Sequence, residues 1–382
     1  MAMLRLTSAL REVEALVVLG EDGPLRPRLE EAGVEVVVLP LSGRTATLRR
    51  DRVSGKLPLF AVTDVIAYVY RLRRLLRERG IEVVQTNSLK ACLYGGLAGR
   101  LSALPVVWHA RDRYSTDYLP RPAVTLVRMA ARLLPTVVIA NSRTTLATLA
   151  PHPPRQPRIA LSNVLDEPAY EVGRRRLAAW QSGAALSGPL VIGLVGRISP
   201  WKGQEVFLRA IAEAFGEHDP SRVQVRLIGS AMFGEDDYAV SMQRLSQELG
   251  IDDRVQWRGF CEDVPAELAE LDVLVHCSTI PEPFGQVVVE GMAAALPVVS
   301  TDVGGPAEVI DDTRTGLLVR AGDHHELAAV LTRLVADPDE RHRLGSAAHD
   351  AANAYRGENA AAPFDAIFRR LSARRRSGVI HR

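Results

Sequence analysis

Val191-Ile-Gly-Leu-Val-Gly-Arg-Ile-Ser-Pro-Trp-Lys-Gly203 joins a short apolar run to a turn that carries two cations. The continuously apolar residues from Leu190 to Val195 predict a buried strand. The turn contains Pro200 and Gly203, and the residues after it, from about Gln204 to Phe215, predict a helix. A strand, a turn and a helix in this order are the building unit of parallel α/β sheets.

Arg197 and Lys202 flank this turn. Cations at a strand-to-helix turn can bind a diphosphate, because open α/β sheets hold their ligands at the carboxyl ends of the strands. Ordinary exposed loop charges explain the segment equally well when it is taken alone. The choice between these interpretations depends on a second segment.

That segment is Glu282-Pro-Phe-Gly-Gln-Val-Val-Val-Glu290. Gly285 permits close approach of a ligand to the backbone, and the apolar run from Val287 to Ala295 predicts a helix whose first N–H groups suit a phosphate. Glu290, about two turns on, could accept hydrogen bonds from ribose hydroxyls. Two glutamates at this spacing are often only a solvated helix face, but both segments in this order predict a nucleotide-sugar site.

Composition and length agree with a two-domain globular protein. The chain has 382 residues, of which 47% are hydrophobic and 24% charged, and its net charge of +2 argues against a nucleic-acid partner. Cys92, Cys261 and Cys277 have neither metal-binding nor redox spacing and fit a reducing compartment. No apolar run reaches the roughly 18 residues of a membrane span and no signal peptide is visible, so we expect a cytoplasmic protein.

Strands and helices alternate in both halves, which predicts parallel sheets with covered faces. In the N-terminal half we expect strands at 15–19, 34–39, 83–86, 106–110 and 136–141, and helices at 23–32, 61–79, 89–101 and 123–133. The alternation lapses between Pro151 and about Gly188, where residues 174–181 predict a polar linker helix. A second alternating set runs from Leu190 to about Asp337.

These motifs resemble the retaining glycosyltransferases of family 4, whose GT-B architecture consists of two Rossmann-like, doubly wound parallel-sheet α/β domains facing a cleft. The matching segments in the C-terminal half are 196–203, 227–230, 255–260, 272–278, 282–294 and 297–308. In the N-terminal half the matching segments are 86–90, 107–112 and 139–142. The resemblance is more specific in the C-terminal half, which it covers almost without interruption.

The resemblance implies a domain plan. It places an acceptor domain at 1–165, a linker at 166–188, a nucleotide-sugar domain at 189–355, and a helix with a basic tail at 356–382 that returns to the first domain. Domains of this family usually open with a buried strand and a Gly-rich loop. Residues 1–10 instead match the helix after that loop, so we expect the first strand to be missing from this sequence.

The resemblance also implies roles for individual residues. Glu282 would hold the donor sugar and Glu290 the ribose, Arg197 and Lys202 would stabilise the departing diphosphate, and His109, at a strand end, would touch the sugar unless it is simply structural. The expected catalytic residues are His109, Glu282, Arg197 and Lys202. The expected donor-binding residues are Gly196, Arg197, Lys202, Phe260, Cys261, Glu282, Phe284, Gly285, Gln286, Val287 and Glu290. No Asp-x-Asp signature lies near a strand end, so no metal and no other cofactor is expected.

The sequence thus predicts a retaining glycosyltransferase that moves a sugar from a nucleotide-diphosphate donor to the hydroxyl of a glycan, lipid-linked or small-molecule acceptor. One alternative is a GT-B sugar-nucleotide 2-epimerase, which needs carboxylates that we cannot place in the N-terminal half. The other is a donor-binding protein without transfer activity. Within the expected helix, relatives usually carry alanine at position 291 and glycine at 295, and Gly291 lowers helix propensity by about 1 kcal/mol relative to alanine.

Basic residues cluster in the N-terminal half: Arg44, Arg49, Arg50, Arg52, Lys56, Arg71, Arg73, Arg74, Arg77 and Arg79. They could be solvated charges on a helix and a loop. They could also bind an anionic membrane surface, each adding about 1 kcal/mol, with Leu57, Leu59 and Phe60 as an apolar edge. On the second interpretation we expect peripheral contact with the inner face of the membrane.

Overall fold

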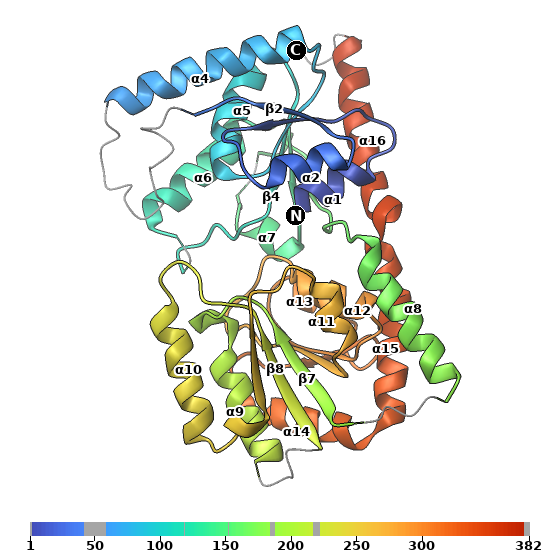
Figure 1. Cartoon of the computed structure of the whole chain (residues 1–382). Coiled ribbons are helices and arrows are strands. Elements are labelled where there is room, and N and C mark those ends of the chain that lie inside the picture. Colours follow the sequence, from blue (N-terminus) through green and yellow to red (C-terminus); the bar gives the residue numbers. More distant parts are fainter. Residues whose placement is uncertain are drawn as a thin grey trace. The chain divides into compact units, whose positions relative to one another are not determined.

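The chain forms two compact units, residues 1–164 with 357–382 and residues 165–356 (Figure 1). The computed structural model describes residues 2–41, 59–117, 119–151, 153–183, 188–216 and 222–377, and only the backbone of 59–62. The basic residues from Arg44 to Lys56 and the side chains of Leu57, Leu59 and Phe60 therefore lie outside the described residues.

The first unit contains parallel strands joined by helices. Its elements are α1 (Ala2–Ala9), β1 (Leu16–Leu19), α2 (Leu25–Glu31), β2 (Glu35–Val38), α4 (Leu59–Glu78), β3 (Val84–Thr86), α5 (Leu89–Leu101), β4 (Val106–Ala110), α6 (Arg121–Leu133), β5 (Val137–Ala140), α7 (Arg143–Ala147), β6 (Arg158–Ala160) and α16 (Gly357–Arg376). The strands form two parallel sheets, β1-β2 and β3-β4-β5-β6. The single sheet expected for this half is divided in two: among the described residues, no strand pairs with both β1 and β3.

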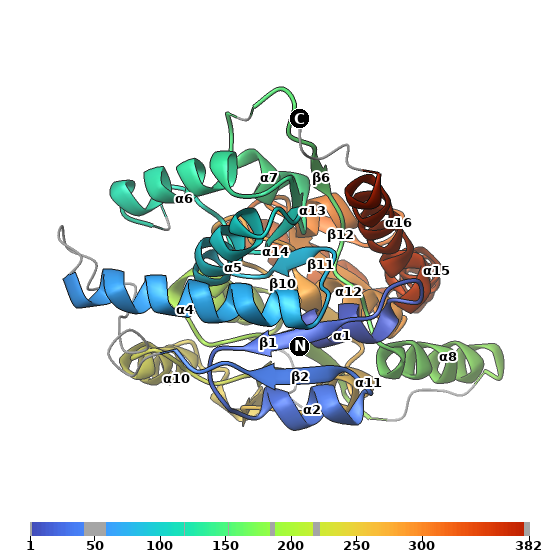
Figure 2. The same ribbon diagram turned by 90° about the horizontal axis from the view of Figure 1, so that it is seen from above.

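Helices cover the four-stranded sheet on both faces. On one face α4, α5 and α6 lie next to one another (Figure 2), and Leu72 and Leu76 of α4 pack against Val84 and Val106. On the other face α16 packs through Phe364 and its apolar neighbours against Val107 and Ile139. The apolar side of α16 is therefore part of the core of the first unit.

The second unit is built around a six-stranded parallel sheet. Its elements are α8 (Glu167–Gln181), β7 (Leu190–Val195), η2 (Pro200–Lys202), α9 (Gln204–Phe215), β8 (Val223–Ile228), α10 (Asp236–Glu248), η3 (Asp252–Arg254), β9 (Val255–Gly259), α11 (Val264–Ala269), β10 (Val273–His276), α12 (Gln286–Ala293), β11 (Val298–Thr301), α13 (Pro306–Val309), β12 (Leu317–Val319), α14 (His324–Ala336), α15 (Pro338–Ala352) and η4 (Asn353–Tyr355). The strand order is β12-β11-β10-β7-β8-β9, with Val273 of β10 beside Ile192 of β7. The strand β7 and the helix α9 have the predicted bounds.

Helices cover both faces of this sheet, as a doubly wound fold requires. Phe207 of α9 and Leu331 of α14 lie in the core on one side, and Val288 of α12 lies in the core on the other. Tyr170 of α8 lies in that second core, and its hydroxyl donates a hydrogen bond to the Ala352 carbonyl. The segment 166–188, expected to be a linker, thus contributes α8 to the second unit, because this helix has an apolar side to bury.

Candidate functional site

The predicted site lies where the strand order of the second unit changes direction. From β7 the chain continues to β8 and β9 on one side, and β10 to β12 lie on the other. Ligands of open α/β sheets bind at such a switch point, at the carboxyl ends of the two central strands. Here β7 leads to the Gly196–Gly203 turn and β10 leads to the segment with Glu282, so the topology brings the two predicted segments together.

Gly203 fixes the start of α9 against the end of β10. It has a φ of +77°, and a Cβ atom at this position would lie 1.9 Å from the carbonyl oxygen of Cys277. Only glycine combines this backbone conformation with so close an approach. The turn that carries Lys202 is therefore held directly beside the segment that leads to Glu282.

Lys202 and Glu282 form an ion pair at this point. Lys202 Nζ donates to Glu282 Oε2 at 2.7 Å, and their side chains are only 13% and 15% exposed. The ammonium also lies 4.5 Å from the ring centre of Trp201. The sequence assigned these two residues to different parts of a donor, and the structure joins them directly.

Two further residues hold the same carboxylate. His276 Nε2 lies 2.5 Å and Ser278 Oγ lies 3.1 Å from Glu282 Oε2, and His276 Nδ1 lies 3.1 Å from Ser300 Oγ. Burial would raise the pKa of Glu282, but the charge of Lys202 and the contact with His276 outweigh it and hold that pKa well below its usual range. Glu282 is therefore a fixed carboxylate anion at neutral pH.

Arg197 lies in the same turn with a different set of neighbours. Its Nε is 3.5 Å from Glu235 Oε2, and its guanidinium lies 5.7 Å from the ring centre of Trp201 and 5.1 Å from that of Phe233. Phe233 is exposed. The arrangement keeps a second cation near Lys202, on the loop that follows β7.

The helix predicted to bind phosphate is α12. Gly285 caps its start with a φ of +77°, and a Cβ atom there would lie 2.6 Å from Pro306. Gln286 and Val287 form its first turn, and Glu290 is buried further along. The side chain of Phe284, a predicted donor-binding residue, does not face a ligand, because its ring is buried in the core beside Tyr355.

The remaining predicted donor-binding residues lie at the ends of β7 and β9. Gly196 follows β7 and donates its N–H to Ile228 at 2.9 Å. Phe260 follows β9 and is exposed, whereas Cys261 donates its thiol to the Asp263 carbonyl at 3.2 Å. Phe260, like Phe233 on the loop after β8, is therefore an exposed aromatic side chain near this edge of the sheet.

Gly304 and Gly305, which follow β11, approach the protein's own backbone closely. A Cβ atom at 304 would lie 2.5 Å from Glu282 N, and one at 305 would lie 2.4 Å from Phe284 Cα. Gly305 also donates its N–H to the Glu282 carbonyl at 2.7 Å. These glycines hold the Glu282 segment in place.

His109 lies in the first unit, at the carboxyl end of β4. Its ring is 1% exposed and lies 5.2 Å from the Phe364 ring, and Nδ1 is 3.2 Å from Arg111 Nη2. Burial, and then the charge of Arg111, lower the pKa of His109 well below its ordinary value, so the ring is neutral. Its Nε2 is buried and has no hydrogen-bond partner among the described residues.

Two family models match the chain. The model described as glycosyl transferases group 1 matches residues 180–351, and the model described as glycosyltransferase family 4 matches residues 25–161. The chain belongs to the group 1 glycosyltransferases. Its two parallel-sheet α/β units are the GT-B architecture of this family.

Several characterised glycosyltransferases are similar to this chain. The D-inositol 3-phosphate glycosyltransferase of Nocardia farcinica is 33% identical over 46% of this chain and 39% of its own length. The chain spans about 37% to 56% of the length of the enzymes of that name that it matches. The 2-deoxystreptamine glucosyltransferase of Streptomyces kanamyceticus is 28% identical over 88% of this chain and 89% of its own length.

The solved structures include HepE of Anabaena in complex with UDP and glucose. It is 25% identical to this chain, covers 95% of it and 93% of its own length, and has a TM-score of 0.77. HepE in complex with UDP-glucose is 26% identical over 99% of this chain and 95% of its own length, with a TM-score of 0.75.

Sequence reasoning missed three members of this candidate site. His276 and Ser278 lay in a matching motif but received no role, and Glu235, beside Arg197, was not considered. His276 follows the apolar residues Val273–Val275, so the strand-end argument that singled out His109 would also have identified it. No local signal predicts Glu235, because its contact with Arg197 depends on how the loop after β8 folds.

Proposed function

We propose that this protein transfers a sugar, with retention of configuration, from a nucleotide-diphosphate donor to a hydroxyl acceptor, without a metal cofactor. The observation that carries the proposal is the buried Lys202–Glu282 pair at the switch point, with Arg197 beside it and the start of α12 behind it. These groups supply cations and helix N–H donors where negative charge grows on a departing diphosphate.

Each group has a distinct part in this proposal. Lys202 and Arg197 stabilise the diphosphate, Glu282 accepts hydrogen bonds from the donor sugar, and Glu290 accepts them from the ribose. His109, as a neutral imidazole, offers Nε2 to the sugar. When the donor is bound, Lys202 is shared between the carboxylate and the phosphate, so its ion pair with Glu282 orients it for that contact.

We propose a uridine diphosphate sugar as the donor, because HepE, which is similar along nearly the whole chain, is described with UDP and with UDP-glucose. The acceptor is proposed to be a hydroxyl of a polyol, a glycan or a lipid-linked precursor. The names of the related enzymes, which act on D-inositol 3-phosphate and 2-deoxystreptamine, support a cyclic polyol as the first compound to test.

The test combines binding with turnover. Titration calorimetry with UDP, GDP, ADP and dTDP identifies the base, and release of nucleoside diphosphate from the corresponding sugar in the presence of polyol acceptors reports transfer. A protein that binds nucleotide but releases no nucleoside diphosphate with any acceptor would be a donor-binding protein. Interconversion of the donor with its 2-epimer would favour the epimerase alternative, and absence of any nucleotide binding would refute the proposed site.

We further propose that the first unit contacts an anionic membrane surface through an apolar helix face. This face comprises exposed residues of α5 and of the two helices that contact it, α4 and α6: Ile66, Tyr70, Leu97, Leu101, Leu126, Met129 and Leu133. No described helix is both long and apolar enough to cross a bilayer. An exposed apolar face with basic residues nearby supports attachment to the surface of a membrane.

The charges around this face support the choice of an anionic surface. Ile66, Tyr70, Arg73 and Arg77 recur at helical spacing on one side of α4, and Arg100 of α5 donates to the carbonyl of Leu133 in α6. Not every predicted basic residue contributes, because Arg74 and Arg79 form ion pairs with Glu78 and Glu35. The apolar edge expected at 57–60 is replaced in this proposal by the described helix face.

Vesicle co-sedimentation tests this surface. We expect the wild-type protein to bind anionic vesicles at low salt and to dissociate above about 0.15 M salt, where the Debye length is about 8 Å. Met129→Glu with Leu133→Glu should weaken binding about tenfold or more, whereas Val240→Glu, an equally exposed site in the second unit, should not. Equal, negligible binding to neutral and anionic vesicles at low salt would refute the proposal.

A further inference from the structure

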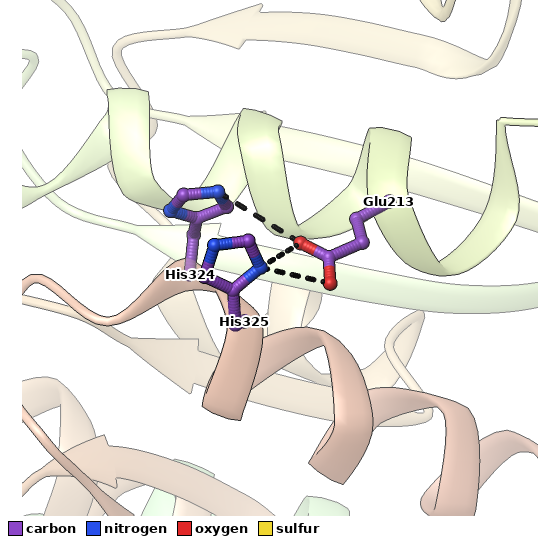
Figure 3. Close-up of side chains that lie close together, drawn as sticks. All are labelled: Glu213, His324 and His325. Carbon is purple, nitrogen blue, oxygen red and sulfur yellow. Dashed lines mark hydrogen bonds and ion pairs between the residues drawn. The ribbon is translucent and has the colours of Figure 1, made fainter.

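Two adjacent histidines and a glutamate meet on the second unit, away from every predicted donor-binding residue. His324 and His325 begin α14, and Glu213 lies near the end of α9 (Figure 3). His325 Nδ1 is 2.8 Å from Glu213 Oε2, and His324 Nε2 is 3.8 Å from the same oxygen. One potential ligand atom from each residue lies within 4.8 Å of the other two.

These distances are close to those that a tetrahedral metal ion requires. Zn²⁺ binds histidine nitrogen and carboxylate oxygen at about 2.0–2.2 Å, which separates neighbouring ligand atoms by about 3.4 Å. The observed separations of 2.8 Å and 3.8 Å lie on either side of that value. Both rings face the same carboxylate (Figure 3), so small side-chain rotations would bring the three atoms to the required spacing.

An ion pair alone does not account for all three residues. Glu213 hydrogen-bonds to His325 and, with its charge and that of Asp323, raises the pKa of His325. His324 Nε2 is too far from the carboxylate for a hydrogen bond, yet its ring packs against that of His325 with centres 4.0 Å apart. Two imidazoles and one carboxylate are the ligands of many zinc sites, whereas Mg²⁺ and Ca²⁺ prefer oxygen alone.

We propose that Glu213, His324 and His325 bind a transition-metal ion of the Zn²⁺ type, with water as the remaining ligand. The ion would join the end of α9 to the start of α14 and so stabilise the second unit. Because the ligands are partly exposed and number three, binding is exchangeable rather than permanent. This site is independent of glycosyl transfer, for which no metal is expected.

Calorimetric titration of the metal-free, untagged full chain with ZnCl₂ tests the proposal. We expect one Zn²⁺ per chain and a higher melting temperature with Zn²⁺ but not with Mg²⁺. Glu213→Gln and His325→Ala should each weaken Zn²⁺ binding tenfold or more. His324→Ala is the decisive variant, because this residue makes no hydrogen bond to Glu213 and its other contact with the cluster is ring packing against His325.

The matched control is His342→Ala, whose imidazole stacks on Trp180 outside the cluster and should not affect Zn²⁺ affinity. Nucleotide binding, measured in parallel, should be the same in all four variants, which separates this proposal from the proposed function. No Zn²⁺ binding tighter than about 1 mM, or affinity unchanged by His324→Ala, would overturn the proposal.

Discussion

Replacement of Lys202 by methionine should destabilise the second unit through Glu282. Methionine keeps most of the length of the lysine side chain but removes the ammonium that lies 2.7 Å from Glu282 Oε2. The carboxylate is 15% exposed, so water replaces that contact poorly. Removing one member of a buried ion pair usually lowers stability by about 3–5 kcal/mol, since the other charge is left without its partner.

The expected loss is at or just below the lower end of that range. His276 and Ser278 still contact the same carboxylate oxygen in the variant and keep part of its charge satisfied. We therefore expect Lys202→Met to lower the free energy of unfolding by about 2–3 kcal/mol at neutral pH. In a protein that already carries Glu282→Gln, no carboxylate is left unpaired, so Lys202→Met should have little further effect. The coupling energy between the two substitutions in a double-mutant cycle should therefore be about 2 kcal/mol.

Guanidinium denaturation of the wild type, Lys202→Met, Glu282→Gln and the double variant measures this coupling. Trp180, Trp201 and Trp257 lie in the second unit, so tryptophan fluorescence mainly follows its unfolding. The pKa of Glu282 is depressed in the folded state, so its stabilisation is fully present above the unfolded pKa of about 4.3 and is lost progressively as the pH falls from there through the much lower folded pKa. The difference between wild type and Lys202→Met should therefore narrow below about pH 4. A coupling under about 0.5 kcal/mol, or a difference that persists in acid, would refute the reasoning.

Three other expectations concern the same unit. Arg197→Ala should reduce kcat/KM about 100-fold or more through loss of charge stabilisation, and steady-state kinetics at the wild-type value would contradict this role. In calorimetry Glu290→Gln should weaken binding of the nucleoside diphosphate itself, whereas Glu282→Gln should mainly weaken binding of the full donor; equal losses of nucleoside diphosphate affinity would disprove the division. Gly291→Ala should lower the free energy of unfolding by about 1–3 kcal/mol in denaturant titrations, because its Cβ would lie 2.2 Å from Leu274 Cδ2. The control Gly357→Ala, with open space around it, should be neutral or slightly stabilising. A stabilised Gly291→Ala would show that helix propensity dominates.

Local patterns were sufficient for the elements around the site. The apolar run Leu190–Val195 and the turn ending at Gly203 predicted β7 and α9 with their observed bounds, because strand length and the glycine cap are encoded locally. The same holds for α5 and β4. The order of the strands, and with it the switch point that brings Lys202 to Glu282, depends on long-range pairing and was not predicted from the sequence.

Pairings between distant side chains could not be predicted. Counting basic residues did not reveal that Arg79 is paired with Glu35. Helix propensity alone made Gly291 look unfavourable, although the Leu274 side chain of β10 fills the space beside it. The strand-end position of His276 could have been noticed in the sequence, but its contact with Glu282 could not. Each of these contacts joins segments whose approach is decided by the packing of the sheet and its helices.

The return of α16 to the first unit has a consequence for the order in which the chain folds during synthesis. Residues 1–164 leave the ribosome before the whole second unit, residues 165–356, has been made, and only then does α16 follow. At about 5–20 residues per second this delay is about 10–40 s. During that time Val107, Ile139 and the ring of His109 lack the Phe364 side chain that covers them, so the nascent first unit exposes apolar surface that a chaperone could bind.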